Sequence, residues 1–82
     1  EPGNGVVKLF VNRGKRSGIN EDSLRWALTE GAVIPEGEIG DIRVLERFSF
    51  VELPDEHARI ALERLDGTKL EGKQIRLEYA KD

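Results

Sequence analysis

The chain has 82 residues, of which 38% are hydrophobic and 35% are charged, and its formal net charge at pH 7 is −3. This length suits one small domain, and the absence of cysteine excludes disulfide bonds and thiolate metal sites. No apolar run reaches the roughly 18 residues that a membrane helix requires, so no membrane partner is expected.

The charged residues are unevenly distributed along the chain. Residues 8–16 contain four basic side chains and no acid, whereas residues 17–41 contain six acids and the single Arg25. A net acidic charge is unfavourable for nucleic-acid binding, so such a function would depend on the basic segment. Because the basic residues continue into a segment at residues 13–19 that contains Gly14 and Gly18, we predict there a flexible cationic loop that can follow a phosphate backbone. An ordinary solvated surface is the alternative interpretation.

The first strand is predicted over residues 7–12, after a linker or terminus at residues 1–6 that shows no periodicity. One face of this strand is aliphatic and suits a core, and it carries Val7, Leu9 and Val11. The opposite face is mixed, and it carries Lys8, Phe10 and Asn12.

The first helix is predicted to begin after Asn20, a favourable N-cap residue, and to end at about Glu30, before Gly31. Its apolar side is formed by Leu24, Ala27 and Leu28. At about 100° per residue, Trp26 points away from that side. Two interpretations of Trp26 remain open: the indole covers the following loop at residues 33–35, or it contacts a partner.

Two further strands are predicted over residues 39–46 and 46–53, joined by a tight turn near Glu46. The third strand is apolar on both faces. Its aliphatic face suits a core and carries Ser49, Val51 and Leu53. Its other face suits a partly covered surface and carries Phe48, Phe50 and Glu52.

The second helix is predicted over residues 55–65, between Pro54 and the stop signal Asp66-Gly67. After a short connection at residues 68–72, the last strand is predicted over residues 73–80, with residues 81–82 as a terminus. The domain therefore covers residues 7–80. In this last strand the side chains predicted to face inward are Ile75 and Leu77. The mixed face carries Gln74, Arg76 and Glu78.

The predicted order is βαββαβ, a split-βαβ sandwich of the α+β class, with a four-stranded antiparallel sheet and two helices. Each helix has one apolar stripe, and right-handed crossovers place both on the same face of the sheet. The first and third strands are central in the usual order of this topology. Phe10, Phe48 and Phe50 then converge on the uncovered face.

Catalysis has little support in the sequence. His57 is the only histidine, and we interpret it as solvated or as part of a helix cap. The acid pairs at residues 21–22 and 55–56 are explained by the helix dipole. The remaining acids lack the order expected of metal ligands, so neither an enzyme, a metal nor a cofactor is predicted.

Several motifs resemble RNA-recognition-motif domains. The first strand reads Leu9-Phe10-Val11 and the third reads Arg47-Phe48-Ser49-Phe50-Val51, with Arg47 where that family usually has Gly. A narrower resemblance is to the DbpA-type C-terminal RNA-binding domain of bacterial DEAD-box RNA helicases, including the cold-shock helicase. It rests on Phe10-Val11-Asn12, Gly14-Lys15-Arg16, Gly18-Ile19, Ile39-Gly40-Asp41-Ile42 and Phe48-Ser49-Phe50-Val51-Glu52-Leu53-Pro54.

The resemblance implies an RNA-recognition-motif-like fold and a non-catalytic RNA-binding domain that docks a helicase chain onto structured RNA, in some members a ribosomal RNA hairpin. Ribosome biogenesis, cold shock and a cytoplasmic location follow as expectations, and a chain without cysteine fits a reducing compartment. The predicted RNA-binding residues are Lys8, Phe10, Asn12, Arg13, Lys15, Arg16, Arg43, Arg47, Phe48, Phe50 and Arg76. The alternative is a protein-binding module of the same fold, in which the aromatic residues of the sheet or Trp26 contact a peptide or a helicase domain.

Overall fold

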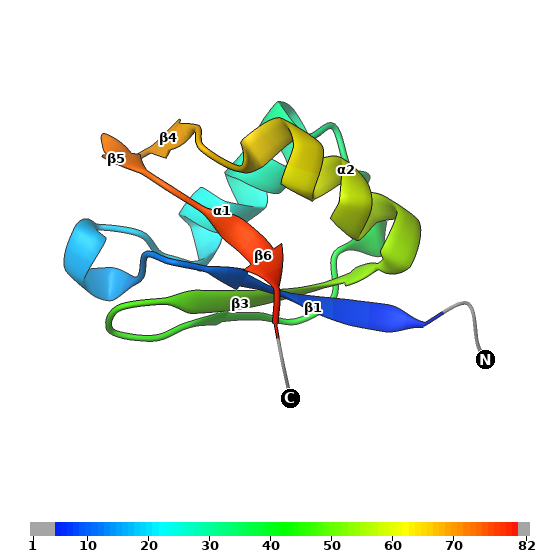
Figure 1. Cartoon of the computed structure of the whole chain (residues 1–82), viewed down its shortest axis with the longest axis horizontal. Helices are drawn as coiled ribbons and strands as arrows, with labels where there is room; N and C mark the ends of the chain where they lie inside the picture. The colour runs from blue at the N-terminus through cyan, green and yellow to red at the C-terminus, as the bar shows by residue number, and fades with distance from the viewer. Residues whose placement is uncertain (1–4, 81–82) are drawn as a thin grey trace.

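Alternating side chains in β1 (Val6–Val11) and β3 (Ser49–Pro54) give the sheet one apolar face and one mixed face. The computed structural model describes residues 5–80, which form one layer of sheet and one layer of helices (Figure 1). The two strands pair antiparallel, with Leu9 opposite Val51 and Phe10 opposite Phe50. Directly opposed residues share a face, so the aliphatic and aromatic sets of both strands are segregated.

The sheet has the strand order β2-β3-β1-β6, and a separate two-stranded hairpin is formed by β4 and β5. The remaining strands are β2 (Ile42–Val44), β4 (Lys69–Leu70), β5 (Lys73–Gln74) and β6 (Leu77–Tyr79). The helices are α1 (Glu21–Trp26), which continues as the π-helical segment η2 (Ala27–Gly31), and α2 (Asp55–Leu65). Two 3₁₀ turns are η1 (Lys15–Ser17) and η3 (Glu36–Glu38).

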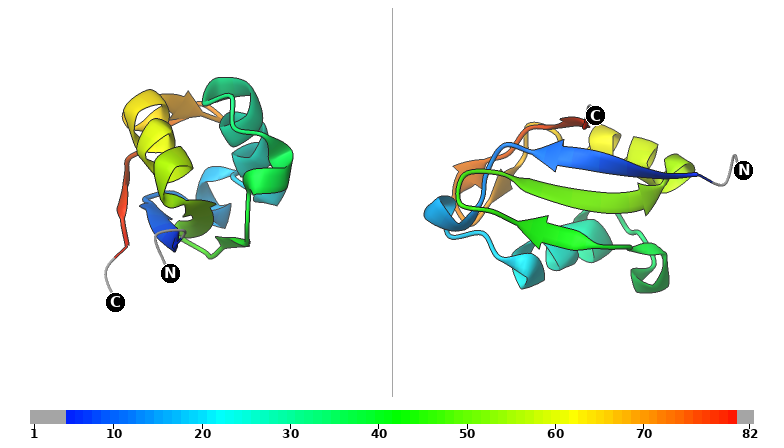
Figure 2. Two further views of the ribbon diagram at one scale, coloured as in Figure 1. Left: turned by 90° about the vertical axis from the view of Figure 1, so that its right-hand side faces the viewer. Right: turned by 90° about the horizontal axis from the view of Figure 1, so that it is seen from below.

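Both helices cover the same face of the sheet, as the end view in Figure 2 shows. Between the layers Leu9, Leu53 and Ala58 are fully buried, at 0% exposure each. The other face carries no layer of helices over residues 5–80, and the right-hand view of Figure 2 looks directly onto it. The predicted α+β class, the βαββαβ order and the central position of the first and third strands are confirmed.

Several strand boundaries differ from the prediction, and β3 begins at Ser49 rather than at residue 46. β1 begins at Val6, whereas residues 1–4 of the predicted linker and the predicted terminus at 81–82 lie outside the described residues. β2 is shorter than the predicted strand at 39–46, although its pairing with β3 extends through further backbone hydrogen bonds on both sides. The Glu52 amide donates to the Asp41 carbonyl, and the Leu45 amide donates to the Phe48 carbonyl.

The predicted last strand at residues 73–80 is wrong as one continuous element. Its first part, β5, pairs with β4 across the two-residue turn Glu71-Gly72, whose φ angles are +54° and +79°. Positive φ at both positions is the geometry of a tight hairpin turn, and it turns β5 back along β4. Only β6, which follows Ile75 and Arg76, joins the main sheet beside β1.

The predicted flexible basic loop is instead folded against the loop between β2 and β3. The amides of Lys15 and Arg16 donate to the carbonyls of Leu45 and Glu46, each over 2.9 Å. Gly14 permits this approach, since a Cβ there would lie 2.2 Å from the Leu45 carbonyl oxygen and 2.7 Å from the Phe48 nitrogen. Gly14 therefore fixes the cationic segment beside the third strand.

The exposure of two side chains on the helical layer, Trp26 and His57, tests what the sequence predicted for them. Trp26 is 61% exposed, so the loop that follows η2 does not bury the indole. His57 is not solvated: its side chain is 18% exposed and its Nε2 lies 3.8 Å from a Glu38 carboxylate oxygen. Within residues 5–80, none of the helices has the length and apolar character needed to cross a membrane.

Candidate nucleic-acid interface

Strand pairing arranges the uncovered face of the sheet, here called the open face, in three rows that run across the strands. The middle row consists of Arg43, Phe50, Phe10 and Glu78. The loop row, beside η1, consists of Leu45, Phe48, Asn12 and Arg76. The far row consists of Asp41, Glu52, Lys8 and Ala80.

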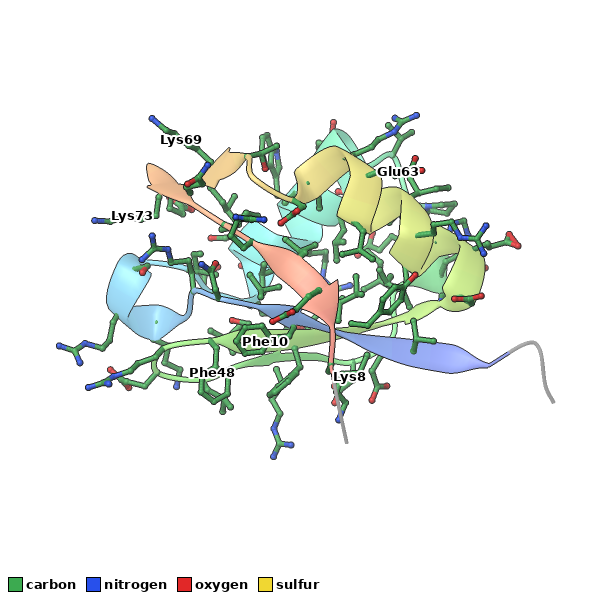
Figure 3. The ribbon with its side chains drawn as sticks, in the orientation of Figure 1. Lys8, Phe10, Phe48, Glu63, Lys69 and Lys73 are labelled. Atoms are coloured by element: carbon green, nitrogen blue, oxygen red, sulfur yellow. The ribbon has the colours of Figure 1, made fainter. Side chains whose placement is uncertain are left out.

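The three phenylalanines form one aromatic cluster at the centre of the open face. The Phe10 and Phe48 ring centroids are 5.6 Å apart, Phe10 and Phe50 are 5.9 Å apart, and Phe48 and Phe50 are 5.6 Å apart. Phe48 is 36% exposed, and the other two rings are half-buried. Figure 3 shows Phe10 and Phe48 on the side of the sheet that faces away from the helices. The predicted convergence of the three rings is confirmed.

Lys8 and Arg43 place positive charge next to this cluster. The Lys8 Nζ lies 5.5 Å from the Phe50 ring centroid, which is a cation–π geometry. Arg43 is exposed and stands opposite Phe50 in the middle row. Aromatic rings next to cations suit a ligand that has both flat bases and phosphates.

The loops at the η1 end of the sheet carry a second group of cations. Lys15, Arg16 and Arg47 are all exposed there, and the bonds from η1 to the β2–β3 loop hold the first two close to the third. Ser49 strengthens the connection, since its buried hydroxyl donates to the Arg13 carbonyl over 2.8 Å. We call Lys15, Arg16 and Arg47 the basic end.

Three of the residues predicted to bind RNA are already engaged within the fold. The Asn12 Oδ1 accepts from the Arg76 amide over 2.8 Å, and the Arg13 Nε donates to the Gln74 carbonyl over 3.0 Å. The Arg76 guanidinium binds the Asp66 carboxylate over 2.9 Å. These contacts join β1, β5 and the end of α2, so they stabilise the edge of the sheet at this end.

The ion pair between Arg76 and Asp66 perturbs both groups. The Arg76 hydrogen bond, together with the Leu77 amide, lowers the pKa of Asp66 below its ordinary value of 3.8. The same hydrogen bond raises the pKa of Arg76. Asp66 therefore stays ionised to lower pH than an ordinary aspartate. The ion pair holds β6 against the C-terminal end of α2.

Two cations were missed by the sequence analysis because they belong to the unpredicted hairpin. Lys69 in β4 and Lys73 in β5 are exposed, and Figure 3 shows both at the end of the molecule that carries η1. The Arg13 bond to the Gln74 carbonyl ties this hairpin to the segment that leads into η1. The sequence feature that could have predicted this hairpin is the pair Glu71-Gly72, which is compatible with a tight turn.

An open hollow of about 310 Å³ lies at the β6 side of the aromatic cluster, and it is lined by Phe10, Phe50, Glu78, Tyr79 and Ala80. The sequence analysis did not single out Glu78 as a site residue, since nothing local places it opposite Phe10. Within residues 5–80, no group of three or more histidine, aspartate or glutamate side chains is placed to hold a metal ion.

A four-stranded sheet with helices on one face, and with aromatic rings and cations on the other, defines a single-domain nucleic-acid-binding sandwich. The model of the family described as the DbpA RNA binding domain matches residues 8–79. The chain therefore belongs to the DbpA RNA-binding domain family and is a non-catalytic RNA-binding module. Comparison with curated proteins found no match.

Proposed function

We propose that this domain anchors a DEAD-box RNA helicase to structured RNA of the ribosomal hairpin type, in the cytoplasm, during ribosome biogenesis or cold shock. The helicase context is supported by the resemblance of the motifs in β1, η1 and β3 to such domains. RNA itself is supported by membership of the DbpA RNA-binding domain family.

The observation that carries the preference for a hairpin is the continuity of the basic end with the aromatic cluster. Phe48, at the edge of the cluster, lies in the same loop row as Leu45, whose carbonyl binds the Lys15 amide. A hairpin presents closely spaced phosphates in its stem and unstacked bases in its loop. The stem phosphates would meet the basic end while loop bases stack on the phenylalanines.

The RNA preference can be tested with this chain and two RNAs of equal length, one a hairpin and one unstructured. We expect the hairpin to bind more tightly and to shift the amide resonances of both η1 and β3. Affinity should fall with salt by a log–log slope of about −0.7 to −0.9 per phosphate contact. Equal affinity for both RNAs would contradict the hairpin preference, and a salt-independent affinity would contradict phosphate binding.

The helicase part of the proposal concerns the complete gene product. We expect that protein to hydrolyse ATP and to be stimulated by the hairpin, with the double variant Lys15→Glu, Arg16→Glu requiring far more hairpin for half-maximal stimulation. Stimulation by unstructured RNA should change less, because that RNA also binds directly to a helicase core. A gene product without RNA-dependent ATP hydrolysis would refute the helicase context and leave RNA binding by this domain intact.

A second candidate function is protein binding through α1, and the exposed Trp26 favours it. The indole is 61% exposed on a helix whose neighbouring charges are mainly acidic. Arg25 is occupied by ion pairs with Glu21 and Glu36. If Trp26 contacts a protein, Trp26→Ala should leave hairpin affinity unchanged and weaken association with the helicase core, measured by titration calorimetry.

A further inference from the structure

The middle row places a carboxylate directly beside the aromatic cluster. Glu78 in β6 stands opposite Phe10 in β1, so both side chains project from the open face. They line the same open hollow of about 310 Å³, which is bounded by Phe50 on its other side. The hollow has room for one planar ring stacked on Phe10, with the edge of that ring directed at Glu78.

We propose that this hollow binds a guanine base of the RNA, which stacks on Phe10 while the Glu78 carboxylate accepts hydrogen bonds from the guanine N1–H and 2-amino groups. The inference rests on the RNA-binding function and adds a base preference to it. Glu78 is then a specificity-determining residue, distinct from the cations that bind phosphates.

The choice of guanine follows from the hydrogen-bonding chemistry of a carboxylate. An ionised carboxylate accepts hydrogen bonds and donates none, and its two oxygens suit two adjacent donors. Guanine is the base whose Watson–Crick edge offers two adjacent donors. Cytosine and adenine present one amino group beside an acceptor nitrogen, and uracil presents one N–H between two carbonyl oxygens. Each of these places a lone pair against the carboxylate.

The charge environment of Glu78 supports a base edge rather than a phosphate as its ligand. Over residues 5–80 Glu78 forms no ion pair within 4.0 Å, and the nearby Arg76 guanidinium is bound to Asp66. The charge of Glu78 also helps to raise the pKa of Arg76, but the guanidinium itself is held by Asp66. A carboxylate without a direct ion pair on a surface that binds RNA repels phosphates, so its favourable partner is a hydrogen-bond donor. Arg43 lies at the opposite end of the middle row, three strand spacings or about 14 Å away. Phosphate and base contacts are thereby separated across the row.

Phe10 is a better stacking surface than Phe50 for this base. The Lys8 ammonium lies over the Phe50 ring at 5.5 Å, so a base stacked there would displace a cation–π contact. In the described part of the chain, no such cation lies over Phe10. Lys8 lies in the far row, which is adjacent to the middle row that lines the hollow. Its charge can therefore meet the phosphate of the same nucleotide.

The test uses five short single-stranded RNAs that differ at one position, where they carry guanine, inosine, adenine, cytosine or uracil. Affinities are measured by fluorescence anisotropy for the wild type, Glu78→Gln and the control Glu52→Gln, which removes a negative charge from the far row. We expect the wild type to prefer guanine over adenine, cytosine and uracil by about tenfold, the lower part of the range for a good two-point base contact. Inosine lacks the 2-amino group and should fall between guanine and the others.

Glu78→Gln should abolish the guanine preference by weakening guanine binding, whereas Glu52→Gln should retain the preference. Unchanged thermal midpoints would show that both variants are folded. A wild type that binds all five RNAs equally, or a guanine preference that survives Glu78→Gln, would overturn the inference while RNA binding stands. If neither these strands nor the hairpin binds, the proposed function fails, and this inference fails with it.

Discussion

The two faces of the sheet are made by the same strands, but one is buried under the helices and the other is exposed. In β1 and β3 the residues Leu9, Val51 and Leu53 are almost completely buried under the helices. Their immediate neighbours Phe10 and Phe50 keep half-buried rings on the open face. The same two strands therefore supply both the core and the candidate binding surface, separated only by the two-residue alternation of a strand.

The difference between the faces shows how a domain of this size can carry a core and an exposed aromatic surface on the same strands. Large side chains on the covered face are surrounded by protein, so their removal leaves a cavity. Rings on the open face contact mainly one another, at centroid distances of 5.6 to 5.9 Å. Such ring pairs add about 0.5–1.5 kcal/mol each to stability. Because the rings contact mainly one another, their outer surfaces are available for a ligand.

The largest expected effect is on the covered face. Leu53→Ala should lower the free energy of unfolding by about 2–5 kcal/mol, because Leu53 is 0% exposed and its cavity cannot fill with water. Urea denaturation followed by circular dichroism measures the loss. A loss below about 1 kcal/mol would mean that the two layers can close over the cavity.

The second effect concerns affinity for a hairpin RNA and compares the basic end with the aromatic cluster. Lys15→Glu with Arg16→Glu should weaken binding on the order of 100-fold, since two charged hydrogen-bonding contacts are lost and two repulsions are added. The triple change Phe10→Ala, Phe48→Ala, Phe50→Ala should cost about tenfold, because a hairpin offers few unstacked bases.

The matched control for this charge reversal is Arg59→Glu with Arg64→Glu, which changes the net charge equally on exposed positions of α2. It should cost far less affinity, since these residues lie on the helical layer. If the phenylalanine variant is the weaker binder, the open face is the main site and the basic end is auxiliary. Fluorescence anisotropy against one labelled hairpin gives all four affinities.

A third effect separates binding from stability at a single ring. Phe48→Ala should weaken the binding of a short single-stranded RNA by roughly fivefold or more, the loss of one stacked base. It should cost about 1–3 kcal/mol of stability, because the 36%-exposed ring loses two ring pairs that contribute about 0.5–1.5 kcal/mol each. A stability loss as large as that of Leu53→Ala, with unchanged RNA affinity, would assign this ring to the core.

The smallest effect concerns the edge of the sheet and depends on pH. The Arg76 guanidinium and the Leu77 amide lower the pKa of Asp66 below its ordinary value of 3.8, so the folded state binds this proton less readily than the unfolded state. The resulting stability is fully present above pH 3.8 and is lost as the pH falls through the folded-state pKa.

Asp66→Asn should therefore melt at a lower temperature than the wild type at pH 7, and the two midpoints should converge as the pH falls below 3.8 and through the folded-state pKa of Asp66. The matched control is Asp55→Asn, at the start of α2, whose contact with Arg59 is longer, at 3.7 Å. If the difference in thermal midpoint between wild type and Asp66→Asn stays the same at low pH, the charge of Asp66 does not contribute to the stability of the fold. Differential scanning fluorimetry over a pH series is sufficient.

Much of this molecule follows from short-range features of the sequence. The alternation in β1 and β3 assigns Leu9 and Phe10, or Val51 and Phe50, to opposite faces, because successive side chains of a strand point in opposite directions. The Asn20 cap was predicted, and its side chain indeed accepts from the Ser23 amide over 2.8 Å. Each of these features involves residues within a few positions of one another.

Other features were decided by contacts between distant parts of the chain, which no local pattern contains. Asn12 and Arg13 looked like free polar residues, but they bind the backbone of Arg76 and Gln74, more than 60 positions away. The last strand divides because Glu71 and Gly72 turn β5 onto β4, and only β6 reaches β1. Glu78 stands opposite Phe10 for the same reason. Composition and alternation determined which residues are apolar, cationic or outward-facing, whereas strand pairing in three dimensions decided which of them are neighbours.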